Sequence, residues 1–376
     1  MSEPIYLDYN ATTPVDPRVI EAMLPYLGTH YGNPSSDHVY GRAAKAAVDQ
    51  ARAEVAALIG AQPAEIVFTG CATEANNLAL QGAARALLSG SRRTLLYSAV
   101  EHPSVTQPMR QLANAGWTVA EIPVDASAQV DADALEIGGD VALVSVMLAN
   151  NEVGTIQPIR AIAERARAAG ALLHVDAAQA VGKIAVNVDE LGCDLLTLAG
   201  HKFYAPKGVG ALYVRAGTAL IPIMQGAGHE RGLRPGTENV PHLVALGTAA
   251  RLAREEGARE SARIQSLRDA LHSRLAGAIP GLMLNGDAEA RLPNTLNLSF
   301  PGMTGWDLLA ASPMLAASTG SACHAGDHAV SGVLAAMGLT AERAAGAVRL
   351  SLGRFTTEAE IGSVAEALIA AWARAR

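Results

Sequence analysis

Short apolar runs alternate with amphipathic stretches along the first two thirds of the chain. The stretch 43–58 places Val48 and Val55 on one face and is followed by Gly60, which is the pattern of a surface α-helix with its usual C-terminal glycine. Alternating strands and helices favour right-handed crossovers, and we therefore predict an α/β fold with a mostly parallel central sheet and helices on both faces. The predicted strands are 65–69, 94–98, 141–148, 171–175, 194–198 and 211–214, and another helix is predicted at 159–169.

The pattern changes near Thr237. Two long helices are predicted at 240–256 and 261–278, and the last helix is expected to begin with a capping box formed by Thr357 and Glu360. Strand-like runs at 295–300 and 349–352 lie between them. We therefore expect a large domain over residues 15–255 and a smaller α+β domain over residues 1–14 and 256–376.

The composition is that of a globular protein with a large core. Half of the 376 residues are hydrophobic, and the net charge of −7 argues against a nucleic-acid surface as the main function. No apolar run approaches the roughly 18 residues of a membrane span, and the first residues lack the pattern of a secretion signal. Three cysteines without a pairing framework favour a reducing compartment, so we expect a cytoplasmic protein.

Chemically versatile side chains directly follow five of the predicted strands. In an open parallel sheet, ligands bind outside the carboxyl ends of the strands, so these side chains are expected to share one crevice. In chain order, they are Thr73 and Glu74, then Glu101 and His102, then Asn150, Asn151 and Glu152, then Asp176 and Gln179, and finally His201 and Lys202.

This set of side chains matches the needs of pyridoxal 5'-phosphate (PLP). Lys202 is able to form a Schiff base with the aldehyde, and Asp176 would keep the pyridine nitrogen protonated, so that the ring acts as an electron sink. Backbone N–H groups of Ala72 and Thr73, at a helix N-terminus, suit the phosphate. The other expected contacts are His102 on the ring face and Asn151 with Gln179 at the phenolic oxygen.

Each of these residues also has an ordinary structural explanation. Taken alone, Asp176 fits a helix cap, and Lys202 fits a solvated surface cation. His102 alone suits a turn or the core, and Asn151 or Gln179 alone suits a contact to backbone in a turn. The shared location at strand ends favours one common site over five unrelated placements.

Cys323 lies in a run of mostly small residues, 318–326, that holds no bulky apolar side chain. Such a run is better suited to displaying a thiol than to burying it, and His324 and His328 offer a base that would activate it. Cys193 lies among leucines and fits a buried core cysteine instead. We therefore expect Cys323 to be a nucleophile.

Ten short motifs carry a family resemblance over essentially the whole chain. Their order and spacing resemble those of the cysteine desulfurases of the class V aminotransferase group, in the branch with a longer cysteine-bearing loop. The resemblance implies a fold-type I PLP-dependent transferase. The motifs include Ala-Thr-Glu at 72–74, His-Val-Asp-Ala-Ala-Gln at 174–179, Gly-His-Lys at 200–202, Arg-Pro-Gly-Thr-Glu-Asn at 234–239 and Gly-Ser-Ala-Cys at 320–323, and the others lie at 7–14, 32–36, 101–102, 150–152 and 351–354.

The resemblance implies a role for each matching position. Lys202 would hold the cofactor, and Cys323 would take the sulfur of L-cysteine as a persulfide, which leaves L-alanine. His102, or His324 beside Cys323, would exchange protons at the departing sulfur. The implied substrate ligands are Asn33 and Arg354, and no metal ligands are implied. The implied cofactor contacts are Ala72, Thr73, His102, Asn151, Asp176, Gln179, His201 and Lys202, with Thr237 reaching the phosphate of a neighbouring subunit in a homodimer.

Two positions depart from the family pattern. Ala199 stands where the family usually has a serine before Gly-His-Lys, so one hydroxyl contact to the phosphate is missing. Cys71 stands where the family usually has a glycine before Ala-Thr-Glu, either as a tolerated small residue or as a second reactive thiol.

The motifs leave other functions open. Selenocysteine lyases also lack the serine hydroxyl and share the 234–239 motif and a Cys-His pair, so L-selenocysteine is an alternative substrate. A catalytically idle scaffold for partner proteins is a second alternative, against which the complete set of Lys202, Asp176, His102 and Cys323 argues. The expected partner is a sulfur-acceptor protein, in iron–sulfur cluster assembly, tRNA thiolation or DNA sulfur modification, and neither membrane nor direct nucleic-acid binding is expected.

Overall fold

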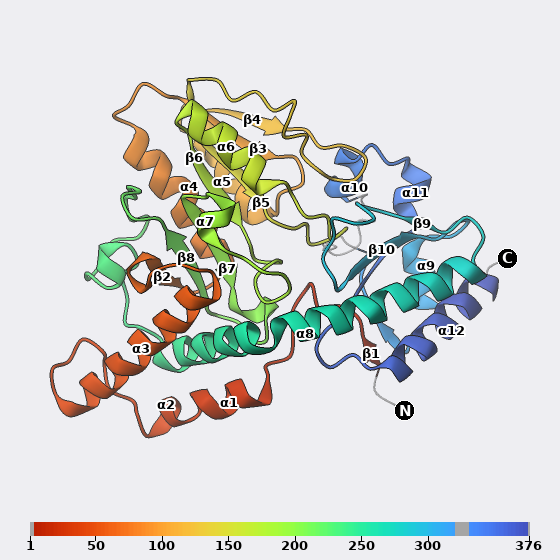
Figure 1. The fold of residues 1–376 in the computed structure, drawn as a ribbon, viewed down its shortest axis with the longest axis horizontal. Coiled ribbons are helices and arrows are strands. Elements are labelled where there is room, and N and C mark those ends of the chain that lie inside the picture. Colours follow the sequence, from red (N-terminus) through yellow and green to blue (C-terminus); the bar gives the residue numbers. More distant parts are fainter. Residues whose placement is uncertain (1–3, 320–330, 375–376) are drawn as a thin grey trace.

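A seven-stranded sheet forms the centre of the larger part of the molecule (Figure 1). The structure is a computed structural model, and it describes residues 4–319 and 331–374. From one edge to the other, the strands are β2 (Ile66–Thr69), β8 (Gly210–Val214), β7 (Leu195–Ala199), β6 (Leu172–Asp176), β5 (Val141–Met147), β3 (Thr94–Ser98) and β4 (Thr118–Ile122). β8 is antiparallel to both neighbours and the other pairs are parallel, which confirms the mostly parallel sheet.

The strands are buried on both faces because successive side chains point into two different helical layers. In β2, Ile66 and Phe68 belong to the apolar cluster of one face, and Val67 between them belongs to the cluster of the other face. The first face is covered by α3 (Val39–Leu58), α6 (Ile159–Ala169) and the first half of α8 (Val240–Ala278), and the second face by α4 (Ala72–Leu87) and α5 (Pro103–Asn114).

Within this seven-stranded sheet, the six predicted strands are confirmed, and one strand, β4, was not predicted. β4 pairs with β3 alone and forms an edge of the sheet. Its residues Thr118, Ala120 and Glu121 are exposed, so the segment has no continuous apolar run. An edge strand with exposed residues on both faces gives a weaker sequence signal than a strand buried on both faces.

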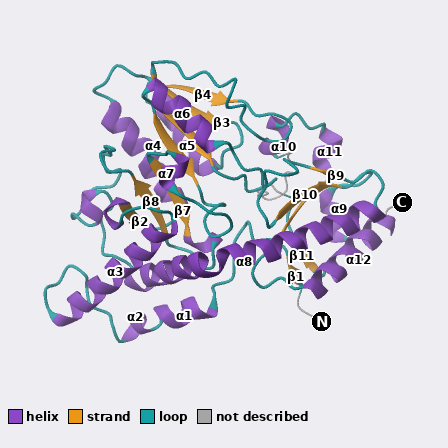
Figure 2. Cartoon of the chain, viewed as in Figure 1, coloured by secondary structure: helices purple, strands orange, loops and turns teal. Residues whose placement is uncertain are grey.

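A second core lies in the part of the molecule that contains the C-terminus (Figure 2). There Leu7 packs in one apolar cluster with Leu271, Leu298, Leu350 and Leu368. This cluster supports the proposed grouping of residues 1–14 with residues 256–376. Its elements are β1 (Ile5–Tyr6), paired parallel to β11 (Leu315–Ala316); the antiparallel strands β12 (Ala347–Ser351), β10 (Thr295–Ser299) and β9 (Met283–Leu284); and the helices α9 (Gly305–Ala310) and α12 (Glu358–Arg374). The short helices α10 (Gly332–Ala336) and α11 (Ala341–Ala345) contribute to a separate apolar cluster, together with Val100 and Met147.

One helix, α8, passes through both parts of the molecule (Figure 1). Its first half packs against α3 and α1 (Pro17–Met23), and its second half packs against α12. The prediction of two separate helices here is wrong. Gly257 keeps the helical backbone, because a glycine inside a helix costs only about 1 kcal/mol and the packing at both ends outweighs that cost. The proposed domain boundary at 255/256 therefore lies inside α8.

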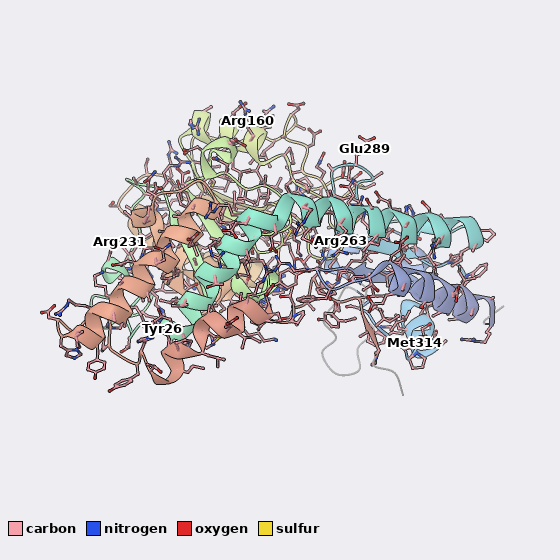
Figure 3. All side chains as sticks on the ribbon, turned by 60° about the horizontal axis from the view of Figure 1, so that its bottom comes forward. Tyr26, Arg160, Arg231, Arg263, Glu289 and Met314 are labelled. Atoms are coloured by element: carbon pink, nitrogen blue, oxygen red, sulfur yellow. The ribbon has the colours of Figure 1, made fainter. Side chains whose placement is uncertain are left out.

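The junction between α8 and α12 is held by Arg263, a half-buried residue of α8 labelled in Figure 3. Its guanidinium donates to the carbonyl oxygens of Arg354 at 2.7 Å and Thr356 at 2.9 Å. The next residues form the predicted capping box of α12: Thr357 N donates to a Glu360 carboxylate oxygen at 2.7 Å, and Glu360 N donates to Thr357 Oγ1 at 3.3 Å. The start of α12 is thus fixed by its own sequence and by α8.

The remaining helical segments are short connections. They are α2 (Pro25–Gly28), α7 (Val188–Leu191) and the 3-10 turns η1 (Pro63–Glu65), η2 (Gly200–Lys202) and η3 (Glu230–Gly232). Within residues 4–319 and 331–374, no helix combines the length and the apolar character that crossing a lipid bilayer requires.

Candidate active site

Lys202 is the last residue of η2, the single turn that follows the carboxyl end of β7. Gly200 opens this turn at a place where no side chain fits, because a Cβ atom there would lie 2.9 Å from the carbonyl oxygen of Val209. The Lys202 Nζ donates to the backbone carbonyls of Asn10 and Ala11, the second at 2.8 Å. The N-terminal arm, residues 6–14, thus orients the amine.

The pKa of Lys202 is lowered to about 8. Desolvation by the surrounding protein is the main cause, the Arg349 guanidinium acts in the same direction, and the carboxylates of Asp8 and Asp176 oppose them. Arg349 is itself held in place, with Nη2 2.6 Å from Asp8 Oδ1. Near neutral pH, Lys202 is therefore deprotonated far more often than an ordinary lysine, which suits attack on a carbonyl carbon.

Asp176 ends β6, the strand beside β7. The residue is only 5% exposed, and both carboxylate oxygens accept hydrogen bonds, Oδ2 from Asn76 Nδ2 at 2.8 Å and Oδ1 from Ala178 N at 2.9 Å. Both donors are neutral, so they fix the orientation of the carboxylate and leave its negative charge uncompensated. The carboxylate is therefore available to a cationic ring nitrogen.

The N-terminus of α4 lies beside Asp176, because Asn76 belongs to the first turns of this helix. The first N–H groups of a helix have no partner within it. Among residues 4–319 and 331–374, no protein acceptor takes those of Ala72 and Thr73. Two free N–H groups and the positive end of a 16-residue helix suit a phosphate.

The two departures from the family pattern lie near this helix start. Ala199 is paired with Gly210, and a Cβ at Gly210 would lie 2.9 Å from the carbonyl carbon of Cys71. Cys71 is the N-cap of α4, and its sulfur accepts from the backbone N–H of Glu74 at 3.5 Å. The thiol therefore has a structural role that a small polar residue would also fill.

His102 caps the N-terminus of α5. Its Nδ1 accepts from the backbone N–H of Ser104 at 3.1 Å and lies 2.8 Å from Ser104 Oγ. The ring is solvent-accessible but recessed among protein atoms. This desolvation lowers its pKa, the Asp176 charge opposes the lowering and the Lys202 charge adds to it. A mainly neutral ring fits both stacking on a pyridine ring and proton exchange.

Gln179 is fixed by a buried lysine. Its Oε1 accepts from Lys183 Nζ at 2.6 Å and its Nε2 donates to Asn10 O at 2.9 Å, while Lys183 Nζ also donates to Asn10 Oδ1 at 2.9 Å. Burial holds the pKa of Lys183 well below its usual value, and the charges of Lys202 and Arg349 act in the same direction. The Gln179 amide can thus point only one way, with one N–H left for a ligand.

Asn151 and His201 border the same region. The Asn151 carbonyl oxygen accepts from Arg349 Nη1 at 3.0 Å and from Asn10 Nδ2 at 3.2 Å. His201 Nδ1 lies 3.1 Å from Thr12 Oγ1, and burial, helped by nearby lysines, lowers the pKa of His201 to about 4. Both residues therefore contact the segments that hold Lys202.

The expected substrate ligands, Arg354 and Asn33, bond other groups of the protein. Arg354 forms an ion pair with Asp16, with Nη1 2.5 Å from Oδ2, and its guanidinium lies 4.6 Å from the centre of the Tyr204 ring. Asn33 is exposed and its Oδ1 accepts from Ser35 N at 2.9 Å. Thr237 is exposed in the segment before α8. In this single chain, neither Asn33 nor Thr237 is hydrogen-bonded to the residues around Lys202 as far as the described parts extend.

Cys323, His324 and His328 lie outside the described residues. The described residues on either side of this segment, Ser318 and Ser331, bond to neighbours of Asn151. Ser318 pairs with Arg349, which bonds the Asn151 carbonyl, and Ser331 Oγ donates to Glu152, the next residue after Asn151, at 2.5 Å. The core prediction for Cys193 is confirmed: it is fully buried, and burial raises the pKa of its thiol to about 12.

Together these residues fit PLP. Free N–H groups at α4 suit the phosphate, the Asp176 carboxylate suits the ring nitrogen, and the Lys202 amine suits the aldehyde. Asn10, Asn76, Lys183 and Arg349 also shape the site, although sequence reasoning had not singled them out. Of these four residues, only Asn10 lies within one of the family motifs, the one at 7–14. The others are single polar residues in a helix (Asn76), a turn (Lys183) and a strand (Arg349), and each bonds a residue at least 100 positions away in sequence.

The comparisons with known proteins agree with this geometry. The family model described as aminotransferase class-V matches residues 5–364. A cysteine desulfurase of Trichormus azollae is 47% identical over 97% of this chain and 92% of its own length. A solved NifS-like protein is 37% identical with a TM-score of 0.92, covering 99% of this chain and 100% of its own, and the solved structure of SspA in complex with cysteine is 34% identical with a TM-score of 0.82, covering 94% and 99%. The chain therefore belongs to the class V aminotransferase family, among its cysteine desulfurases.

Proposed function

We propose that this protein is a PLP-dependent cysteine desulfurase that converts L-cysteine to L-alanine and retains the sulfur on Cys323 as a persulfide. One observation carries the proposal: Lys202, Asp176 and the open N-terminus of α4 meet at the same edge of the sheet. These three groups match the aldehyde, the ring nitrogen and the phosphate of PLP. The similar structure of SspA in complex with cysteine supports L-cysteine as the substrate.

When bound, PLP supplies an electron sink that weakens the bonds at the substrate Cα. We assign the aldehyde carbon to Lys202 and the ring nitrogen to Asp176. The other proposed contacts are Ala72 and Thr73 at the phosphate, His102 on the ring face, Asn151 and Gln179 at the phenolic oxygen, and His201, with Thr237 of a neighbouring subunit completing the phosphate site in a homodimer.

The chain's own residues then perform the transfer. Lys202, with its lowered pKa, is suited to remove the Cα proton. The Cys323 thiolate attacks the substrate sulfur, so that an S–S bond forms as the C–S bond breaks. The carbon keeps the electron pair and takes up a proton, for which His102 is the proposed source. L-cysteine and the Cys323 thiol thus yield L-alanine and the persulfide, with no external oxidant.

The substrate carboxylate is assigned to Arg354 and Asn33. Arg354 already pairs with Asp16, and its Nε is buried without a partner in the described chain, so its guanidinium has an unused donor. A carboxylate that replaced Asp16 would keep the charge balanced. We further propose a cytoplasmic location and a sulfur-acceptor protein as the partner that relieves Cys323 of its persulfide.

The test is alanine release from L-cysteine by protein reconstituted with PLP, with the persulfide located by mass spectrometry. Lys202→Ala is expected to remove the yellow colour of the bound cofactor and to abolish alanine release. Cys323→Ser is expected to keep the colour and to lose persulfide formation. Lys45→Ala is the matched control, because Lys45 is an exposed lysine on α3.

Three outcomes would contradict the proposal. A wild-type protein that stays colourless after reconstitution would point to an idle scaffold. A persulfide on Cys71 rather than Cys323 would reassign the nucleophile. Alanine release from L-selenocysteine but not from L-cysteine, with Cys323→Ser as active as wild type, would identify a selenocysteine lyase.

A further inference from the structure

Asp176 and His102 are joined by two buried side chains that no step of the proposed mechanism uses. Asn76 Nδ2 donates to Asp176 Oδ2 at 2.8 Å and to Ser104 Oγ at 2.8 Å, and Ser104 Oγ lies 2.8 Å from His102 Nδ1. Asn76 is fully buried and Ser104 is 7% exposed. We call Asn76 and Ser104 the Asn76–Ser104 link. It connects β6, α4 and α5.

The hydrogen bonds of this link have a fixed direction. Ionised Asp176 is an acceptor only, so Asn76 must present its NH2 group to it. The Asn76 Oδ1 has no partner in the described chain, and an amide flip would turn this oxygen against the carboxylate. The second N–H of the same NH2 group goes to Ser104 Oγ, so the Ser104 hydroxyl hydrogen is free to be donated onward.

The only acceptor that this hydrogen meets in the link is His102 Nδ1. The backbone N–H of Ser104 donates to the same nitrogen at 3.1 Å. A ring nitrogen that receives hydrogen bonds from two donors carries no proton, so the proton of the neutral ring must be on Nε2. Protonating Nδ1 would break the backbone hydrogen bond and would force the Ser104 hydroxyl to turn away.

We propose that Asn76 and Ser104 are positioning residues, which pass the orientation set by Asp176 to His102 and hold that ring as the Nε2–H tautomer. Asp176 and Lys202 are the charged groups whose fields reach the ring, and both are present in all the variants below. The catalytic meaning of this tautomer rests on the proposed function, because His102 is the assigned proton donor. The tautomer itself is a property of the protein without cofactor.

The test is isotope-edited NMR of the histidine ring nitrogens in the cofactor-free protein, with the His102 signal assigned from His102→Gln. Wild type is expected to show a single Nε2–H tautomer. Ser104→Ala removes the hydroxyl and is expected to give a measurable Nδ1–H population, whereas Ser104→Thr keeps a hydroxyl and is expected to restore the wild-type signal. Thr106→Ala, which deletes a hydroxyl two residues further along α5, is the matched control.

Kinetics of the reconstituted protein provide the second measurement. Ser104→Ala is expected to lower kcat roughly tenfold, as losses of orienting contacts often do, with KM changed less than about threefold. A folded Ser104→Ala protein with the wild-type tautomer would overturn the inference, as would a wild-type His102 protonated on Nδ1. Expected tautomers in a protein that releases no alanine would instead refute only the proposed function.

Discussion

Lys202 shows how neighbours set the reactivity of one side chain. Desolvation and the Arg349 charge outweigh the attraction of Asp8 and Asp176, and the two carbonyl acceptors of the N-terminal arm orient the amine without supplying a negative charge. A carboxylate partner in the same place would hold the amine protonated. The site therefore orients the Lys202 amine and, at the same time, lowers the pKa at which it loses its proton.

The first prediction concerns the pH at which Lys202 captures the cofactor. Because only the unprotonated amine attacks an aldehyde, the rate of PLP capture by the cofactor-free protein should rise with pH, with its midpoint at about 8, and then level off. Stopped-flow absorbance at constant PLP concentration measures this rate. Arg349→Gln removes one cause of the lowering and should move the midpoint upward. A wild-type midpoint near the ordinary lysine value would contradict the prediction.

The second prediction concerns Glu101, which is buried with Oε1 bonded to Ser98 Oγ and Met147 N. Burial raises its pKa to about 8, and the Asp176 charge adds to this. The folded protein therefore binds a proton that the unfolded chain releases above its ordinary pKa of 4.5, so stability is lost as pH rises toward 8, by at most about 1.4 kcal/mol per pH unit.

Glu101→Gln keeps an uncharged group at every pH, so its free energy of unfolding should fall less than that of wild type between pH 5 and 8. Urea denaturation at several pH values measures this difference. Glu164→Gln, an exposed change on α6, should follow the wild-type curve. Parallel curves for wild type and Glu101→Gln would show that Glu101 is ionised in the folded protein.

Residues that act through distant partners were beyond the reach of sequence reasoning. Lys202, Asp176, His102 and Gln179 follow strand ends, and the alternation of strands and helices was sufficient to predict that they share one edge. Asn76 meets Asp176 across 100 residues, and no local pattern distinguishes it from the neighbouring Asn77. Their difference arises only when α4 docks on the sheet.

Among the elements, α8 shows that residue propensities alone do not predict where a helix ends. Two helices were predicted, 240–256 and 261–278, yet one helix continues through Gly257 because both halves are anchored by packing. Helix propensity differs by about 1 kcal/mol at most for such a residue, which is less than the contribution of one buried leucine. Strands buried on both faces were predicted within one or two residues for the opposite reason, since their signal comes from burial itself.

The third prediction compares two glycines of α8. Nothing lies within 4 Å of a Cβ added at Gly257, so Gly257→Ala should stabilise the protein by about 0.5 to 1 kcal/mol. At Gly247 the added atom would lie 2.5 Å from the Ala51 Cα, so Gly247→Ala should destabilise the α3–α8 contact by about 1 to 3 kcal/mol. Urea denaturation measures the free energy of unfolding of both variants. Equal changes at Gly257 and Gly247 would contradict the packing described.

Across the whole molecule, Asn10 joins the parts that form the site. Its Oδ1 accepts from Lys183 Nζ at 2.9 Å and from Asn294 Nδ2 at 3.0 Å, and its Nδ2 donates to Thr295 Oγ1 at 2.9 Å. The N-terminal arm is thereby bonded to the turn after β6 on one side and to residues beside β12 and in β10 on the other. Asn10 lies 1% exposed at this junction.

The fourth prediction is that Asn10→Ala lowers the free energy of unfolding by about 2 to 4 kcal/mol, because Lys183 and Thr295 each lose a buried partner. The variant should also bind PLP more weakly, since Lys202 and Gln179 both bond the Asn10 backbone. Asn77→Ala, on the outer side of α4, is the control and should change stability by less than about 0.5 kcal/mol. An Asn10→Ala protein as stable as this control would refute the joining role.

The position of Asn10 also determines when the site is complete during protein synthesis. Asn10 N donates to Ser351 Oγ, which lies 341 residues further along the chain. At about 5 to 20 residues per second, a ribosome adds that partner roughly 20 to 70 seconds after Asn10. Until then, a nascent chain contains Lys202 and Asp176 but lacks the hydrogen bond from Asn10 to Ser351. The N-terminal arm that orients Lys202 is therefore fixed in place only after synthesis has passed Ser351.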